Sequence, residues 1–136
     1  MAQPHIVNEE DRPIESWEDQ ARGSIKWRTM FSKDISPTDT MSGGIAYLDS
    51  GSRLEPHRHP QAEVYFILDG ELEVTIDGHH HRVKPNTTIF VPGMAEHSIV
   101  NTGRQPARLF YCFATDSFSD VAYQFSAPRP EANRKI

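Results

Sequence analysis

The chain has 136 residues, of which 24% are charged, with a net charge of −5 and a single cysteine, Cys112. This length suits one domain with its own core, and one cysteine excludes an internal disulfide framework. No apolar run approaches the roughly 18 residues of a membrane-spanning helix, Lys and Arg form no cluster, and the first twenty residues are acidic rather than signal-like. We therefore expect a cytoplasmic protein that binds neither nucleic acid nor a membrane.

The first part of the chain combines a polar arm with two predicted strands. Residues 1–22 are polar and mixed, so we expect an N-terminal arm that packs Trp17 on the body of the protein or on a second subunit. Pro13 is compatible with the start of a short helix. Residues 25–31 alternate apolar and polar side chains, as a half-buried strand does. A loop rich in Ser, Thr, Asp and Gly separates them from the next strand, at 45–48.

The remainder of the chain reads as short strands separated by turn residues. Asp77-Gly78 is the signature of a tight hairpin, and the apolar run at 107–113 indicates a strand buried on both faces. Eight to ten strands with almost no helical periodicity predict an all-β jelly roll over residues 23–126, followed by a C-terminal tail at 127–136. The predicted strands in this part are 63–68, 72–76, 80–83, 87–91, 95–100, 107–113 and, as a strand or short helical piece, 121–125.

The stretch from residue 51 to residue 70 carries a candidate metal site. His57 and His59 are one residue apart, so on an extended strand they share a face, and Glu63 follows four residues later. Imidazole nitrogens with one carboxylate suit a divalent ion such as Fe, Mn, Ni or Zn better than Ca or Mg. His97 lies at a predicted strand start, and a closed β architecture brings it to the same point as a fourth ligand.

These residues carry a family resemblance. The spacing G(X)5HXH(X)3E(X)6G of the first cupin motif is met at every defined position, by Gly51, His57, His59, Glu63 and Gly70. The second motif, G(X)5PXGXXH(X)3N, is met by Pro92, His97 and Asn101. Asn86 and Met94 stand where that motif has glycine. Asn tolerates a left-handed backbone, so we expect the turn at Asn86 to survive, and we expect Gly93 to take the strained position beside Met94.

The resemblance to small single-domain cupins implies a double-stranded β-helix and, most often, a homodimer. It also implies a metal inside the barrel, held by His57, His59, Glu63 and His97. The phrases HPQAEVYFILDG, PGMAEHSIVN and FATDSFSDVAYQF resemble the short cupin-type dimethylsulfoniopropionate lyases, and equally many bacterial cupins of unassigned activity. In those lyases, one tyrosine two residues after the ligand glutamate and another near the C-terminus lie at the metal. The matching positions here are Tyr65 and Tyr123.

Strand alternation gives Tyr65 the same direction as Glu63. Ile67 shares that inward face, and the residues between them point outward. A divalent cation nearby favours the phenolate of Tyr65, which then acts as a base, whereas the alternative is a core aromatic whose hydroxyl only finds a partner. Tyr47 and Tyr111 are further candidates for lining the cavity, with core packing as their alternative reading.

Three functions remain open at this point. The first is a metal-dependent lyase that acts on a small carboxylic acid, such as dimethylsulfoniopropionate, by β-elimination with a tyrosine base. The second is an Fe(II)-dependent dioxygenase that uses the open metal position for O₂. The third is a cupin that binds a small molecule without catalysis, and the fold alone does not decide among them.

Overall fold

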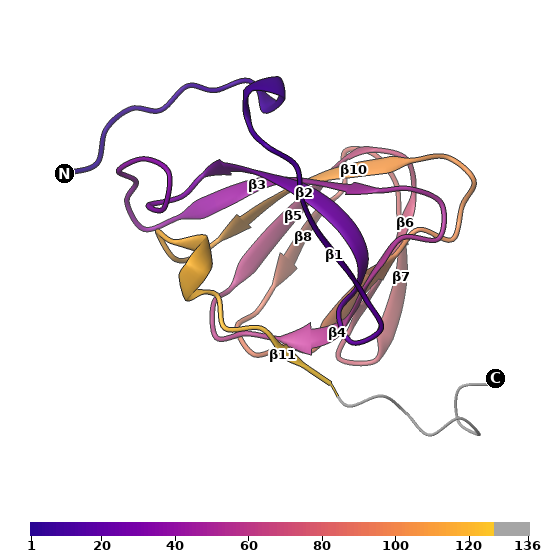
Figure 1. Ribbon diagram of the computed structural model, residues 1–136. Helices are drawn as coiled ribbons and strands as arrows, with labels where there is room; N and C mark the ends of the chain where they lie inside the picture. The colour runs from indigo at the N-terminus through magenta and orange to yellow at the C-terminus, as the bar shows by residue number, and fades with distance from the viewer. Residues whose placement is uncertain (127–136) are drawn as a thin grey trace.

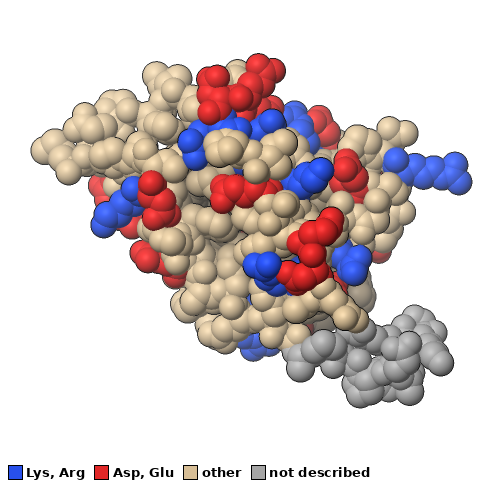
Figure 2. Space-filling model, viewed as in Figure 1, with Lys and Arg blue, Asp and Glu red and all other residues tan. Residues whose placement is uncertain are grey.

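The computed structural model describes residues 1–126, and the predicted tail at 127–136 lies outside the described residues. Within residues 1–126 there are eleven strands, two short 3₁₀ helices and no α-helix. No helix in this part of the chain has the length and apolar character needed to cross a membrane. Figure 2 shows Lys and Arg side chains interspersed with Asp and Glu on the face in view. The absence of a nucleic-acid partner stays a prediction.

The strands are short and follow one another through tight turns. The 3₁₀ helix η1 (Glu9–Asp11) precedes the first strand, and η2 (Phe118–Asp120) precedes the last. The strands are β1 (Glu15–Asp19), β2 (Gly23–Phe31), β3 (Ser42–Leu48), β4 (Arg53–Arg58), β5 (Glu63–Asp69), β6 (Leu72–Ile76), β7 (His79–Val83), β8 (Thr88–Val91), β9 (His97–Val100), β10 (Ala107–Phe113) and β11 (Gln124–Phe125).

A single curled sheet contains all eleven strands, and its pairings are antiparallel (Figure 1). The main path runs β7-β6-β9-β4-β2-β3-β10-β5-β8, with β1 added to β2 and β11 added to β4. Sequence neighbours such as β4 and β5 are therefore separated in the sheet, as crossover connections in a jelly roll require. The prediction of an all-β double-stranded β-helix is confirmed.

Strand β5 shows how alternation builds the core. Glu63, Tyr65 and Ile67 are buried, whereas the side chains between them are only half-buried. On this strand the inner face is thus apolar except for Glu63 and the hydroxyl of Tyr65. The predicted direction of Tyr65 is confirmed, and Glu63, one of the predicted metal ligands, shares its face.

Two predicted burial patterns are wrong in detail. Strand β10 is not buried on both faces, because its residues alternate between buried and half-buried. On the outer face Phe110 stacks on Phe31, with ring centroids 6.3 Å apart. The alternation predicted for residues 25–31 puts Phe31 on the same face as Ile25, but a bulge after Thr29 turns Phe31 outward, and Gly43 across the ladder leaves room for its ring.

The segment after Pro13 is a strand, not a helix. Strand β1 pairs with β2, and Trp17 packs on the body of the protein, with its ring centroid 5.0 Å from that of Trp27. An edge strand with one apolar side chain needs no helical periodicity, so the sequence shows little sign of it. The division of the chain at residue 22 into arm and barrel stays a prediction.

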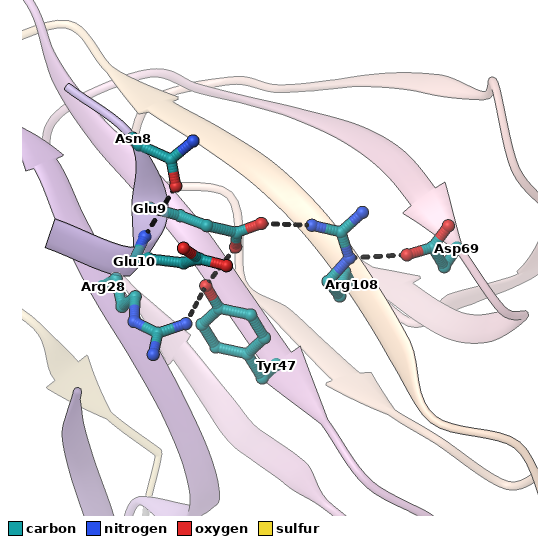
Figure 3. Close-up of polar contacts among 7 residues, drawn as sticks. All are labelled: Asn8, Glu9, Glu10, Arg28, Tyr47, Asp69 and Arg108. Atoms are coloured by element: carbon teal, nitrogen blue, oxygen red, sulfur yellow. Dashed lines mark hydrogen bonds and ion pairs between the residues drawn. The ribbon is translucent and has the colours of Figure 1, made fainter. Parts of the chain in front are cut away.

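A polar network on the outer face fixes η1 to the sheet (Figure 3). Glu9 bridges two strands, because it accepts hydrogen bonds from Arg108 on β10 and from the hydroxyl of Tyr47 on β3. Arg108 also bonds Asp69, and Arg28 donates to Tyr47. Tyr47 therefore belongs to the outer face, and it neither lines the cavity nor packs in the core.

The turn before β9 is built differently from the prediction. Asn86 adopts a left-handed backbone, with φ +71°, as expected, but at the second motif position Met94 itself takes φ +65° and Gly93 does not. Gly93 is needed for a different reason. A Cβ at Gly93 would lie 2.3 Å from the carbonyl oxygen of Pro60, so this glycine allows the loop after β4 to approach closely. Met94 then donates its N–H to the carbonyl of His59 at 2.8 Å.

We expect Gly93→Ala to lower the free energy of unfolding by about 1–3 kcal/mol, the usual cost of forcing extra atoms into a packed site. The added methyl group pushes the backbone at Pro60 away and disturbs the loop that carries His59. Urea denaturation monitored by tryptophan fluorescence measures this loss. Gly103→Ala is the matched control, because its added Cβ meets nothing closer than 3.4 Å. Equal losses in the two variants would contradict the close-approach explanation.

Candidate metal centre

Three histidines converge at one end of the inner face. His57 lies near the end of β4, His59 follows that strand, and His97 begins β9. The pairing of β4 with β9 sets His97 directly opposite His57, after a register shift between Leu54 and His57. One nitrogen from each imidazole lies within 4.8 Å of the others, and each side chain is 1% exposed or less. The structure therefore brings together the three histidines that the sequence predicted.

Backbone carbonyls fix the orientation of each imidazole. Every Nδ1 lies 2.8–2.9 Å from a carbonyl oxygen two residues away along the chain. A carbonyl only accepts hydrogen bonds, so Nδ1 carries the proton and the Nε2 lone pair faces inward. This second contact is typical of metal-binding histidines, since it sets both tautomer and ring direction. The three pairs are His57 with Glu55, His59 with Gln61, and His97 with Ala95.

Glu63 adds a carboxylate to the three nitrogens. Its Oε1 lies 3.3 Å from Nε2 of His59 and 3.2 Å from Nε2 of His97, and the residue is only 4% exposed. Because each Nδ1–H donates to a carbonyl, the Nε2 lone pairs of the histidines and the carboxylate oxygen of Glu63 face one another in a buried space. Such an arrangement needs a cation among its members. The donor set of three imidazoles and one carboxylate thus fits a divalent transition metal.

The charge states of the site also suit a metal. Burial, reinforced by the neighbouring His97, lowers the pKa of His57 to about 3, so the ring is neutral at physiological pH. Burial acts to raise the pKa of Glu63, but contacts with His59 and His97 outweigh it, and the net direction is downward. The site therefore offers a neutral imidazole together with an ionised carboxylate.

A cavity of about 40 Å³ adjoins Glu63 on the inner face. Such a volume suits a small ligand and not a polymer. Its wall is strongly aromatic, and Glu63 is the only charged residue among the described residues that line it. The lining residues are Trp17, Ile25, Trp27, Ala46, Leu54, Glu63, Tyr65, Ile99, Leu109, Tyr111, Phe113, Phe118 and Tyr123.

Both predicted tyrosines line this cavity. Tyr65 is 2% exposed, and its hydroxyl has no hydrogen-bond partner within residues 1–126. The ring of Tyr123 lies 5.0 Å from that of His57 and 5.2 Å from that of His59. Burial, followed by the charge of Glu63, raises the pKa of both phenols well above the ordinary value. Each hydroxyl therefore keeps its proton at neutral pH unless a cation lies beside it.

Several cavity residues have little signal in the sequence. Phe118 lies in a stretch that reads as polar, and nothing in the pattern around Trp17 links it to the site. Trp27 was detectable only as an inward position of a strand, whereas Tyr111 was a named candidate and does line the cavity. Within the described residues, Trp27 Nε1 and the Tyr111 hydroxyl are buried without hydrogen-bond partners. Gly44 leaves space for the latter, because a Cβ there would lie 2.7 Å from it.

Comparison with known proteins assigns the family. The family described as "Cupin domain" matches residues 44–113, which include all four predicted metal ligands. The chain belongs to the cupin family. This cupin is 36% identical, over 124 residues, to a protein of Ruegeria pomeroyi named dimethylsulfoniopropionate lyase DddW. The aligned part covers 91% of this chain and 81% of that protein.

Two solved structures superpose on most of this cupin. The dimethylsulfoniopropionate lyase DddQ of Ruegeria pomeroyi superposes with a TM-score of 0.65 and 26% identity, over 81% of this chain and 54% of that one. The cupin thus spans about half the length of DddQ. A predicted oxalate decarboxylase of Thermotoga maritima gives a TM-score of 0.73 at 22% identity, covering 81% of this chain and 98% of that one. The latter likeness shows the fold alone.

Proposed function

We propose that this cupin is a metal-dependent lyase that cleaves a small carboxylic acid by β-elimination, with dimethylsulfoniopropionate as the first candidate substrate. The observation that carries the proposal is the small cavity in which Tyr65 and Tyr123 stand beside Glu63 and the three histidines. Likeness to a protein named as such a lyase, over most of both chains, supports the substrate.

Four residues would hold the metal, namely His57, His59, Glu63 and His97. When bound, a divalent ion supplies a Lewis acid for a substrate carboxylate and a positive charge beside the phenols. Iron, manganese, nickel and zinc all suit this donor set. The inward Nε2 lone pairs and the ionised Glu63 are the features of the chain that support this assignment.

Tyr65 is the first candidate for the base. Its strand fixes it next to Glu63, and its unpaired hydroxyl is free to act on a ligand. As a phenolate, Tyr65 Oη would take the proton from the carbon beside the substrate carboxylate. The electron pair left behind forms the carbon–carbon double bond as the bond from the β carbon to sulfur breaks. Dimethyl sulfide leaves with the sulfur electron pair, and acrylate is the other product. Tyr123 is the second candidate for this role.

The aromatic wall suits a sulfonium cation. A sulfonium carries positive charge without a hydrogen to donate, so it is attracted by the faces of aromatic rings. Trp17, Trp27 and Phe118 supply such rings around the cavity, and the remainder of the wall is largely apolar. Hydrogen-bond donors that lack partners, at Trp27 and Tyr111, are available to oxygen atoms of the same ligand.

The direct test is an assay of acrylate and dimethyl sulfide from dimethylsulfoniopropionate. The metal-free protein is loaded separately with Fe(II), Mn(II), Ni(II) and Zn(II) and assayed without oxygen. We expect acrylate and dimethyl sulfide in equal amounts from at least one metal form, and none from the metal-free protein. No acrylate from any of the four forms would exclude this substrate.

An Fe(II)-dependent dioxygenase is the second candidate, because three imidazoles and one carboxylate leave open positions on a metal of higher coordination number. Oxygen uptake that depends on Fe(II) and on substrate would favour it, whereas turnover under anaerobic conditions favours the lyase. A cupin that only binds its ligand would keep its affinity for small carboxylates and release no product. Homodimer formation also remains a proposal, which sedimentation velocity tests.

A further inference from the structure

One carboxylate in the loop after β2 holds a segment from the far end of the chain. Asp34 accepts hydrogen bonds from the hydroxyls of Ser32 at 2.8 Å, Ser117 at 3.0 Å and Ser119 at 3.0 Å. It also accepts the backbone N–H of Ser119, and Ser32 accepts that of Phe118 at 3.0 Å. The bond from Ser32 helps to lower the pKa of Asp34, so the carboxylate is ionised at neutral pH. These contacts join positions 83 residues apart in sequence.

The segment that Asp34 holds carries part of the cavity wall. Phe118, in η2, packs with its ring 6.0 Å from that of Trp27, and Tyr123 follows after a short stretch without regular structure. Among the described strands, none includes residues 114–123. No ladder of backbone hydrogen bonds therefore fixes this stretch, and separate contacts hold it in place. Besides those of Asp34, the carbonyl of Asp116 accepts bonds from the Lys33 N–H and the Thr38 hydroxyl, and the side chain of Gln61 donates to the carbonyl of Asp120.

The second end is held by the sheet. Strand β11 pairs with β4, so that Phe125 stands opposite His57, and Ser126 donates its N–H to the carbonyl of Pro56 at 2.9 Å. Tyr123 thus lies between two attachments, the Asp34 cluster on one side and β11 on the other. Between them, the Gln61 bond to Asp120 is the other hydrogen bond from the body of the protein, so losing either attachment loosens the backbone that sets the direction of the phenol.

We infer that Asp34 is a positioning residue for the site. It holds η2 against the loop after β2 and thereby keeps the ring of Tyr123 over His57 and His59. The inference rests on the proposed function, in which Tyr123 lines the substrate cavity and is the second candidate for the base. Asp34 itself touches neither the histidines nor Glu63 among its hydrogen-bond partners, so its effect is transmitted through Ser117 and Ser119.

Hydrogen exchange, which needs no substrate, tests whether Asp34 holds the segment that carries Tyr123. In the full-length, metal-loaded protein, Asp34→Ala is expected to raise exchange at residues 117–123 by at least about tenfold, because the segment then opens locally. Exchange in β5 and β10 should not change. Asp39→Ala is the matched control, since it removes the same charge from the same loop and the Asp39 side chain has no hydrogen-bond partner among the described residues. Ser119→Ala, which removes fewer contacts, should give a smaller rise.

A double-mutant cycle tests whether Asp34 affects turnover through Tyr123. Asp34→Ala is expected to lower kcat by about 10–100-fold, as misplacement of a reacting group does, with the metal content unchanged. In a Tyr123→Phe background the same substitution should have little further effect, because the group that it positions is already absent. A general loss of structure would instead lower kcat equally in both backgrounds.

The possible results separate this inference from the proposed function. Unchanged exchange at residues 117–123 in Asp34→Ala overturns the positioning role, whatever the activity. Faster exchange together with equal kcat losses in both backgrounds also overturns it. If no metal form releases acrylate, the proposed substrate fails, and the exchange experiment alone then decides whether Asp34 holds Tyr123 in place.

Discussion

His97→Ala is expected to weaken divalent-metal binding by more than about 100-fold, because even the outer partners of metal-bound histidines contribute 10–100-fold to affinity. The substitution removes one of three convergent nitrogens and leaves the Oε1 of Glu63 without one of its two close partners. Lyase turnover should fall below detection at any metal concentration that does not saturate the damaged site. Isothermal titration with Mn(II) or Zn(II), followed by elemental analysis of the purified protein, measures the loss.

His81→Ala is the control for this experiment. His81 lies on β7 with its side chain exposed, and β6 separates this strand from β9, which carries His97. We expect this variant to bind metal as tightly as the original protein. If His97→Ala kept its affinity, or if both variants lost it equally, the convergence of His57, His59 and His97 would not be the metal centre.

Tyr65→Phe is expected to lower kcat by about 10²–10⁴-fold, the usual contribution of a positioned acid–base group. The change removes only a hydroxyl that has no hydrogen-bond partner within residues 1–126, so folding should be unaffected or slightly more favourable. Metal content and KM should stay close to those of the original protein. Steady-state assays of acrylate release, with thermal unfolding in parallel, separate the chemical effect from a structural one.

The comparison with two other tyrosines sharpens this result. Tyr47→Phe removes a hydroxyl from the outer face, where it bonds Glu9, and should leave kcat unchanged. Tyr123→Phe tests the rival base. A larger loss in Tyr123→Phe than in Tyr65→Phe would transfer the role of base to Tyr123, and full activity in both variants would exclude a phenolate mechanism.

The convergence of the candidate metal ligands could be predicted because their placement depends on local rules. Alternation along an extended strand gives His57 and His59 one face, and the antiparallel pairing of β4 with β9 supplies His97. The same alternation aligned Tyr65 with Glu63. Each of these inferences needs only the direction of a side chain from a strand, which sequence spacing determines once the strand is recognised.

The cavity wall could not be predicted in the same way. Trp17 reaches it from an edge strand, and Phe118 reaches it from a 3₁₀ helix that Asp34 holds from a distant loop. Such contacts join parts of the chain that share no local pattern. The prediction for the turn at Met94 was wrong for a related reason. Gly93 is needed where Pro60 approaches closely, and Met94 takes the left-handed backbone instead.

Trp17 and Tyr123 meet edge to face, with ring centroids 5.0 Å apart, although they come from opposite ends of the described chain. The four residues proposed to hold the metal all lie between positions 57 and 97. The two ends of the chain therefore cover a site whose proposed ligands come from the middle of the sequence. An ion that enters before these ends pack together does not have to pass them. A protein loaded with metal only after folding must admit the ion past that closed wall, so loading during expression should be faster and more complete.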